Sequence, residues 1–457
     1  MRDDEANRFS ARAARYARVG ANAGLLAARL GVNRLAGGAG ANDARALADA
    51  LGALKGPMMK VAQLLATVPD LLPNDYAEAL TTLQSHAPAM GPSFVRRRMQ
   101  AELGPNWQSR FQSFDATAAA AASLGQVHRA ISLDGQILAC KLQYPDMGSA
   151  VEADLRQLDL LFALHRRMGA AIDTREFRHE VAARLREELD YAHEAKCAAL
   201  YRLMLSDYSD IQVPRVRPEL STGRLMTAEW LDGERLHAVE GRSQALRNAV
   251  ATALFHAWWV PFLRYGVIHG DPHLGNYSIL REGEELRALN LFDFGCVRVF
   301  PPSFVEGIVS LTRALKNGDG EALASAYARC GFRRLSPAAR DAVTIWARFL
   351  CAPILEDRER TIADGVKPGE FGRREMGRMM RALKGEDEAL APPREFVFFD
   401  RAAIGLGAAF LRLGARLNFH RLFEAPIADF DVEALAKRQR EALSACRLEA
   451  EARRGAS

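Results

Sequence analysis

Two short segments of the chain contain side chains whose types and spacing could do chemistry. The first reads H-G-D-P-H-L-G-N at 269–276, and the second reads F-D-F-G at 292–295. Such a pair of segments could hold a metal for hydrolysis, hold a nucleotide for phosphoryl transfer, or simply turn the chain between core strands. The choice depends on whether the residues between them bring the polar side chains together.

A predicted hairpin joins the two segments. Residues 277–281 and 286–292 have strand character and flank a polar turn. In an antiparallel hairpin, the residue that enters the first strand lies beside the residue that leaves the second. We therefore expect Asn276 and Asp293 to meet at one end, with Asp271 close to both on a loop that contains Pro and Gly.

Asp271, Asn276 and Asp293 would together supply hard oxygen ligands and one spare carboxylate, which suit Mg²⁺ and phosphate better than zinc. Phosphoryl transfer uses a carboxylate in a catalytic loop, an Asn five residues later that binds metal, and the Asp of a D-F-G. The chain has these groups in the same order. We interpret Asp271 as the catalytic residue and Asn276 and Asp293 as metal ligands.

The two histidines of the first segment have an alternative interpretation. His269 and His273 alternate with Asp271 and could bind a transition metal, but such spacing needs a strand to point all three side chains one way. Gly270 and Pro272 indicate a loop instead. We expect both histidines to order this loop through hydrogen bonds.

A first hairpin lies upstream, where 126–132 and 136–143 flank Asp134-Gly135, a dipeptide that favours a tight turn. Lys141 lies on its outgoing strand after L-A-C, in the place of the lysine of a kinase V-A-I-K. A lysine between apolar residues in a strand must find an anionic partner or reach solvent. We expect Lys141 to pair with nucleotide phosphates and with a glutamate on a following helix.

The candidate helix for that glutamate is 186–194, which contains several carboxylates. Asp190 and Glu194 would share one face, and Glu188 would project about 120° from Glu194. Two carboxylates of one helix could then serve different cations. The alternative is an acidic face in solvent.

The segment before the first hairpin takes the place of a glycine-rich phosphate loop. It contains the alanine run 118–122 followed by S-L-G-Q-V-H at 123–128, with a single glycine. Backbone amides could still approach phosphates, although methyl groups restrict the conformations and the approach. The residues that we assign to ATP binding here are Ala121, Ala122, Ser123, Gly125 and Gln126.

The rest of the chain is predicted to be rich in helices, at 8–86, 151–205 and 243–265 and from about 300 onward. Outside the two hairpins, strand character is expected only in a third short pair, 212–217 with 224–230. A Pro- and Gly-containing stretch ends the first helical region near residue 92.

The composition excludes several classes of protein. The 457 residues allow two or three domains, and the net charge of +5 is too small to require nucleic acid. The six cysteines form no C-x-x-C pair, so neither a zinc site nor a disulfide framework is expected. No apolar run of about 18 uncharged residues predicts a membrane-spanning helix, and the nearest candidate, 404–413, contains Arg412.

In combination, these motifs resemble the UbiB/AarF-type atypical kinases, a protein-kinase-like family tied to coenzyme Q (ubiquinone) biosynthesis. The similar segments lie within about 55–300. They are A-A-S-L-G-Q-V-H at 121–128, A-C-K-L-Q-Y-P at 139–145, E-L-D-Y-x-x-E-A at 188–195, H-G-D-P-H-L-G-N at 269–276 and F-D-F-G at 292–295.

The resemblance implies roles for further residues. It pairs Lys141 with Glu194 and identifies Glu188 and Asp190 as the family's E-x-D. It also places the family's K-x-G-Q motif on Lys60 and Gln63, in a helical extension that covers the active site and lets Lys60 reach Glu188. The sequence departs from the family pattern at two positions, where Ala62 replaces a glycine and Leu274 replaces a proline.

The resemblance also implies the fold, an α+β, helix-rich, bilobal protein-kinase-like fold. We expect the helical extension at 1–92, an N-lobe with the alanine-rich loop, the Lys strand and the E-x-D helix at 93–230, and a mainly helical C-lobe at 231–457. The expected activity is that of an Mg-ATP-binding atypical kinase or ATPase that supports ubiquinone or other prenyl-lipid metabolism.

Two other functions remain open. A small-molecule phosphotransferase of the aminoglycoside or choline kinase type would have a similar H-G-D-x-x-x-x-N loop but no helical cover. A nucleotide-binding scaffold would be expected to lack Asp271, Asn276 or Asp293, and all three are present.

The expected location is the cytoplasm, peripheral to the inner face of a membrane, and mitochondrial if the source is eukaryotic. Arg- and Ala-rich amphipathic segments near 8–36 could lie on an anionic bilayer or pack against other helices. An acidic run at 3–5 argues against a signal peptide, although the residues after it suit a transit peptide. The expected partners are a nucleotide and prenyl-lipid or quinone-pathway proteins.

Overall fold

The computed structural model describes residues 90–122, 124–145, 147–149, 151–152, 155, 185–332, 335–364, 373–383 and 393–450. The chain divides into two compact units. The first has the described residues up to His193 together with Val216–Trp230, and the second has Glu194–Arg215 and the chain from Leu231 onward. The predicted helical extension, with Lys60 and Gln63, lies outside the described residues apart from 90–92.

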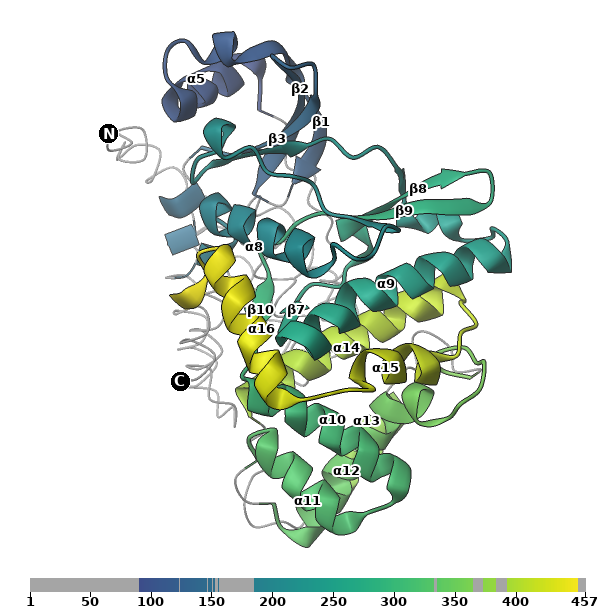
Figure 1. The fold of residues 1–457 in the computed structure, drawn as a ribbon. Coiled ribbons are helices and arrows are strands. Elements are labelled where there is room, and N and C mark those ends of the chain that lie inside the picture. Colours follow the sequence, from purple (N-terminus) through teal and green to yellow (C-terminus); the bar gives the residue numbers. More distant parts are fainter. Residues whose placement is uncertain are drawn as a thin grey trace, which may run out of the picture. The chain divides into compact units, whose positions relative to one another are not determined.

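An antiparallel sheet in the order β1-β2-β3-β5 forms the body of the first unit (Figure 1). Its strands are β1 (Phe111–Ala122), β2 (Gly125–Ser132), β3 (Ile137–Gln143) and β5 (Leu225–Glu229). Gly135 makes the turn between β2 and β3 with a φ of +83°, and its N–H donates to the Ser132 carbonyl at 3.0 Å. The hairpin predicted from Asp134-Gly135 is confirmed.

Strand β1 contradicts the expectation of an alanine-rich loop before this hairpin. Ala118 pairs with His128 and Ala122 pairs with Gly125, with shifts of register between them. Alanine is a poor strand former, but pairing with a neighbouring strand overrides such local preferences. The strand content of this region is therefore higher than the sequence predicts.

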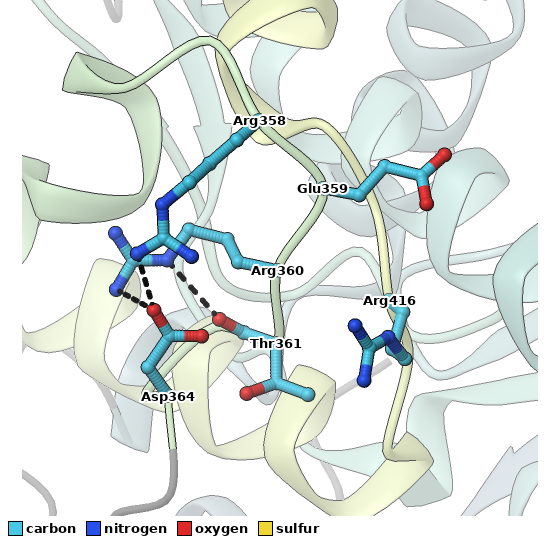
Figure 2. A pocket seen from close by; sticks show the side chains of 6 residues that line it. All are labelled: Arg358, Glu359, Arg360, Thr361, Asp364 and Arg416. Atoms are coloured by element: carbon cyan, nitrogen blue, oxygen red, sulfur yellow. Dashed lines mark hydrogen bonds and ion pairs between the residues drawn. The ribbon is translucent and has the colours of Figure 1, made fainter.

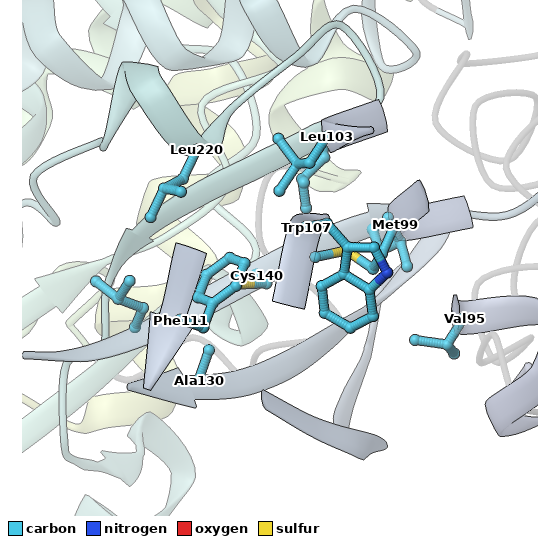
Figure 3. Packing of buried hydrophobic residues seen from close by; sticks show 11 residues of the cluster. Val95, Met99, Leu103, Trp107, Phe111, Ala130, Cys140 and Leu220 are labelled. Atoms are coloured by element: carbon cyan, nitrogen blue, oxygen red, sulfur yellow. The ribbon is translucent and has the colours of Figure 1, made fainter. Parts of the chain in front are cut away.

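One side of the sheet packs against helix α5 (Pro92–Leu103) and the 3-10 helix η2 (Trp107–Arg110). Figure 3 shows the buried cluster that they form. The rings of Trp107 and Phe114 meet edge to face with their centroids 5.1 Å apart. The buried residues of the cluster are Val95, Met99, Leu103, Trp107, Phe111, Ala130, Leu138, Cys140, Leu142, Leu220 and Leu225.

A second sheet, in the order β4-β9-β8-β6, belongs to the second unit. Its centre is the hairpin of β8 (Tyr277–Glu282) and β9 (Glu285–Leu291), which confirms the second predicted hairpin. The strand β6 (Glu234–Arg235) lies antiparallel to β8, and β4 (Ile211–Gln212) lies parallel to β9.

The third predicted hairpin, which joined 212–217 to 224–230, is confirmed only in part, at the point where the Arg217 N–H donates to the Thr227 carbonyl at 2.8 Å. The strands β4 and β5 pair in different sheets, and a single bridge joins Val216 to Ala228. Pro214 lies inside the expected first strand and has no backbone N–H to donate to a partner. This missing donor limits the pairing of the segment.

A two-stranded ribbon, β7 (Val267–His269) and β10 (Val297–Val299), holds the two motif segments together. His269 is paired with Val297. The Gly270 N–H donates to the Cys296 carbonyl at 2.7 Å. The start of the loop at 270–276 and the end of the D-F-G segment therefore share one short stretch of backbone pairing.

Helix α9 (Gln244–Tyr265) is the buried centre of the helical part of the second unit. The Ser243 side chain caps its start by accepting a hydrogen bond from the Leu246 N–H. Gly266 ends it with a φ of +64°, a conformation that glycine adopts without strain. The helices α14, α15 and α16 contact it (Figure 1), and the Phe399 ring of α14 lies 4.7 Å from that of Phe262.

The chain after residue 300 is helical wherever the structure describes it as regular, as predicted. The helices there are α10 (Pro302–Asn317), α11 (Gly320–Arg329), α12 (Pro337–Leu355), α13 (Arg373–Ala382), α14 (Arg394–Leu413), α15 (Phe419–Ile427) and α16 (Val432–Ala445). The remaining elements are α8 (Tyr191–Met204) and the 3-10 helices η3 (Pro218–Leu220), η4 (Leu236–Val239) and η5 (Leu274–Asn276). Within the described part of the chain, no helix is long and apolar enough to cross a membrane.

Candidate functional site

The loop between β7 and β8 is ordered by hydrogen bonds between its own residues. The Asn276 Nδ2–H donates to the carbonyl of Asp271 at 3.0 Å. The Asp271 Oδ1 accepts from the His273 N–H at 3.3 Å, and the His273 Nδ1 accepts from the Gly275 N–H at 3.0 Å. Asp271 and Asn276 are thus fixed relative to each other before any ligand enters.

Asp293 joins this loop at the end of the β8–β9 hairpin. The Phe292 N–H donates to the Asn276 carbonyl at 2.8 Å, which brings the two ends of the hairpin together. Asp293 itself has a φ of +57°, and its Oδ1 accepts from the Gly295 N–H at 3.3 Å. The structure therefore brings Asp271, Asn276 and Asp293 together, as the hairpin argument predicts.

His269 connects the loop to the D-F-G segment. Its Nδ1 accepts from the Asp271 N–H at 3.3 Å, so the proton of the neutral ring lies on Nε2, which donates to the Asp293 carbonyl at 2.6 Å. The Trp258 indole N–H of α9 donates to the His269 carbonyl at 3.2 Å. Both His269 and His273 order the loop, as expected, and His269 also fixes the backbone of Asp293.

Tyr277 follows Asn276 directly and is fully buried. Burial, with a smaller contribution from the Asp271 carboxylate, raises the pKa of its hydroxyl. The Tyr277 hydroxyl therefore stays neutral.

A cluster of buried aromatic rings packs against His269 and the D-F-G segment. The Tyr201 ring of α8 has its centroid 5.4 Å from that of Phe294 and 6.0 Å from that of His269. The Tyr201 hydroxyl is buried and has no hydrogen-bond partner in the described part of the chain. Burial also raises the pKa of this hydroxyl well above its ordinary value, so the group stays neutral.

These contacts predict opposite effects for two changes at Tyr201. Tyr201→Phe removes only a buried hydroxyl without a partner, so we expect the free energy of unfolding to rise by about 1 kcal/mol. Tyr201→Ala removes the ring and should lower it by roughly 3–5 kcal/mol. Urea titration of both variants measures these changes. A loss of more than about 1 kcal/mol in Tyr201→Phe would mean that the hydroxyl has a partner after all.

Helix α14 packs against the loop between β7 and β8 at Gly405. A methyl group at Gly405 would lie 2.6 Å from Cγ of Pro272, which is closer than two carbons can approach. Only a residue without a side chain lets Pro272 rest on the helix at this point. The sequence analysis did not identify Gly405, because its partner lies far away along the chain.

Lys141 lies on β3 in the first unit, between the buried residues Cys140 and Leu142. Because side chains alternate along a strand, Lys141 points to the side of the sheet opposite to these two. Its ammonium group lies 5.0 Å from the centre of the Tyr191 ring, a cation–π contact that the sequence analysis did not foresee. Tyr191 is the last residue of the E-L-D-Y motif at 188–191, and this motif is the sequence signal from which the contact could have been predicted.

The residues assigned to ATP binding lie at the β1–β2 turn. Ala121 and Ala122 are in β1, Gly125 and Gln126 are in β2, and Ser123 lies outside the described residues. Gly125 packs closely, because a methyl group there would lie 2.8 Å from the Tyr191 hydroxyl.

Gln126 is fully buried and its side-chain amide is used within the protein. Its Oε1 accepts from the Met90 N–H at 2.7 Å, and its Nε2 lies 2.8 Å from the His128 ring nitrogen. These bonds give Gln126 a structural role in the first unit. Its contact with a nucleotide stays a prediction.

The predicted helix 186–194 is interrupted, which corrects the argument that Asp190 and Glu194 share one helical face. The chain turns at 188–190, and α8 begins at Tyr191. The Asp190 carboxylate accepts from the His193 N–H at 3.0 Å and so caps the start of α8. Aspartate is one of the preferred residues for such a cap, and this preference ends the preceding helix.

The remaining predicted residues are placed as follows. Glu188 is half-buried in the turn, and Glu194 is buried in the first turn of α8 with 2% of its surface exposed. A carboxylate so deeply buried needs a cation or several donors beside it. The pairing of Glu194 with Lys141, and that of Glu188 with Lys60, remain predictions.

A charged depression of about 400 Å³ lies elsewhere in the second unit, lined by Arg358, Arg360, Asp364 and Arg416 among others (Figure 2). Asp364 pairs with Arg358 at 2.5 Å and with Arg360 at 3.1 Å. Because two of its three guanidinium groups are paired with a carboxylate of the same depression, it offers little excess charge to a phosphate. We do not include it in the candidate site.

The comparison with protein families decides what the two motif segments belong to. A profile described as the ABC1 atypical kinase-like domain matches residues 82–327. The chain belongs to this family. The match includes Lys141, Glu194 and the whole of the loop and D-F-G segments, so the resemblance to UbiB/AarF-type kinases is confirmed.

Individual ABC1 relatives agree with this assignment. AarF domain-containing protein kinase 1 from Xenopus laevis is 30% identical over 286 residues, which are 62% of this chain and 55% of the relative. The atypical kinase COQ8, mitochondrial, from Saccharomyces cerevisiae is 24% identical over 429 residues, 90% of this chain and 83% of the relative. The chain spans 55%, 57% and 34% of the first relatives found.

A solved structure supports the ABC1 kinase-like fold. It is described as the complex of Rv3197 with erythromycin from Mycobacterium tuberculosis and matches with a TM-score of 0.59 and 27% identity. The match covers 82% of this chain and 93% of that chain. The predicted α+β kinase-like fold is therefore confirmed.

Proposed function

We propose that this protein is an Mg²⁺-dependent, ATP-using atypical kinase or ATPase. The observation that supports the proposal most directly is the fixed group of Asp271, Asn276 and Asp293 at the base of one hairpin. The family relatives named as atypical kinases agree with it. The acceptor of the phosphoryl group is not named by any of these residues.

The donor atoms of the site fit a magnesium ion. The Asn276 amide uses its N–H to hold the Asp271 carbonyl, which leaves the amide oxygen for a cation. The carboxylates of Asp293 and Asp271 add oxygen atoms, and oxygen is the ligand that Mg²⁺ prefers. We assign Asn276 and Asp293 as metal ligands and Asp271 as the proton acceptor.

Mg-ATP, when bound, supplies the phosphoryl group that is transferred. Asp271 would accept the proton of the attacking hydroxyl or water, and Lys141 would bind phosphate oxygens as a point charge. His269 would keep the Asp293 backbone in place through its 2.6 Å hydrogen bond.

The proposed biological role is support of ubiquinone or other prenyl-lipid metabolism. The mitochondrial COQ8 relatives are the basis for it. We further propose a peripheral location at a membrane and contact with proteins or lipids of that metabolism. Quinone profiling of cells that lack the protein tests this role, and unchanged ubiquinone would remove it while leaving the ATP site intact.

The central experiment compares ATP turnover of the purified chain with that of Asp271→Asn. We expect phosphate release that requires Mg²⁺ and a loss of about 10²–10⁴-fold in the variant, because the proton acceptor is gone. ATP binding should persist, since Asp271 is not assigned to the metal. Asp429→Asn, at an exposed carboxylate of the same unit, is the matched control. Equal turnover in Asp271→Asn and wild type would contradict the proposed catalytic role.

A further inference from the structure

The helices of the second unit enclose a partly open apolar pocket of about 80 Å³. The helices that line it are α9, α10, α12, α14 and α15. Most of them lie beyond the 82–327 segment that defines the family. Aromatic rings form much of its wall, and they belong to Phe255, Trp259, Phe396, Phe399, Phe410 and Phe419.

Among the described residues that line this pocket, Asp400 of α14 alone has a charged side chain. The Trp346 indole N–H donates to its Oδ1 at 2.6 Å, and no described group donates to its Oδ2. Burial raises the pKa of Asp400 to about 6, so the group is largely ionised at neutral pH.

The other polar groups of the wall offer no positive charge. The Thr312 hydroxyl donates to the Val309 carbonyl of its own helix at 2.8 Å. Burial raises the pKa of the Cys351 thiol to about 12, which keeps it neutral. The carboxylate therefore lies among aromatic rings with one hydrogen bond and without a counter-ion among the described residues of the wall.

Asp400 is half-buried, so its carboxylate loses part of its hydration when it is ionised, and a cation would relieve that cost. An ammonium group would donate a charge-assisted hydrogen bond to the carboxylate and would be attracted by the faces of aromatic rings. A neutral hydroxyl would donate a hydrogen bond but would supply no positive charge. Inorganic anions would be repelled.

We propose that this pocket binds an apolar molecule with a single ammonium group, and that Asp400 is the anchor for that group. The size of the pocket limits what enters it. A cavity of about 150 Å³ holds benzene, so the space here takes roughly three or four non-hydrogen atoms. The ammonium group and its first carbons therefore lie inside, and the rest of the chain leaves through the open side.

Two of the helices that line the pocket, α9 and α14, also contact the segment 269–272. Asp400 and Gly405 both lie in α14, and Gly405 touches Pro272 of the loop. Trp259 of the pocket wall adjoins Trp258, whose indole holds the His269 carbonyl. Helices α9 and α14 thus each contact both the pocket and the segment 269–272, although binding at Asp400 does not depend on the ATP site.

The test is binding of hexylammonium to the full chain without nucleotide, read from the indole N–H signals of its five tryptophans. We expect the Trp346 signal to shift in a saturable way, with hexanol binding about ten-fold more weakly because hexanol has no positive charge to pair with the carboxylate. A Trp346 signal that hexylammonium does not shift would overturn the proposal. This failure would leave the proposed ATP turnover untouched, so the two proposals are tested separately.

Three variants sharpen the test. Asp400→Asn keeps an acceptor for Trp346 but removes the charge, so the preference for hexylammonium over hexanol should disappear. Ala403→Leu fills the pocket and should abolish binding of both. Val397→Ala, at an exposed position of the same helix, should bind like wild type. Retention of the preference in Asp400→Asn, or of binding in Ala403→Leu, would overturn the assignment.

Discussion

Asp293→Asn should reduce Mg²⁺-dependent nucleotide binding by at least about 100-fold. Loss of a partner that merely orients a metal ligand costs 10–100-fold in metal affinity, so loss of a ligand charge should cost no less. Asparagine also adopts the left-handed backbone conformation readily, so the φ of +57° at this position should be kept. The expected loss is therefore one of binding and not of folding.

Titration with a fluorescent ATP analogue, with and without Mg²⁺, measures this effect. Asp207→Asn is the matched control, because Asp207 is an exposed carboxylate of the same unit. The melting temperatures of both variants show whether the fold is intact. An unchanged nucleotide affinity in Asp293→Asn would remove the metal role of this residue. Comparison with Asp271→Asn, which should bind but not turn over, separates the two carboxylates.

The folding stability of the protein should contain a contribution from Asp400 that is lost as the pH rises. Burial raises its pKa from the ordinary 3.8 to about 6, so the folded protein retains a proton that the unfolded chain has released between these values. The contribution is fully present below pH 3.8 and is lost as the pH rises through 6. The shift corresponds to about 2–3 kcal/mol.

The comparison with Asp400→Asn isolates this contribution from other titrating groups. The difference in free energy of unfolding, wild type minus variant, should fall by about 2–3 kcal/mol between pH 4 and pH 8. Urea titrations at several values of pH provide the measurement, with Asp207→Asn as the exposed control. A difference that does not change with pH would mean that Asp400 titrates as it does in water.

The parts of the fold that the sequence predicts well are those with local signals. Asp134-Gly135 specifies a turn, and the hairpin follows from the alternation on either side of it. The β8–β9 hairpin is short, so the positions of Asn276 and Asp293 follow from chain reversal alone. For this reason the core of the candidate site could be predicted from the order and spacing of a few residues.

The parts that the sequence predicts poorly depend on how segments pair and end in the folded protein. The alanine run becomes strand β1 because β2 offers it backbone partners. Asp190 ends one helix and caps the next, although the periodicity of its neighbours continues without a break. Gly405 meets Pro272 only in the folded protein. The strand pairing and the Gly405 contact have no signal in their own segments, whereas the Asp190 cap has a local signal that the helical periodicity of its neighbours obscured.

The hydrogen bond between His269 and the Asp293 carbonyl bears on how the site is controlled. If the D-F-G segment swung away, the buried Nε2–H of His269 would lose its acceptor, which costs about 1–3 kcal/mol. The same displacement would pull on the β7–β10 pairing and on the Phe294 ring beside Tyr201. We therefore expect the proposed metal-binding side of the site to be preassembled. We expect the activity to be regulated through the access of substrates to the site and not through movement of the D-F-G segment.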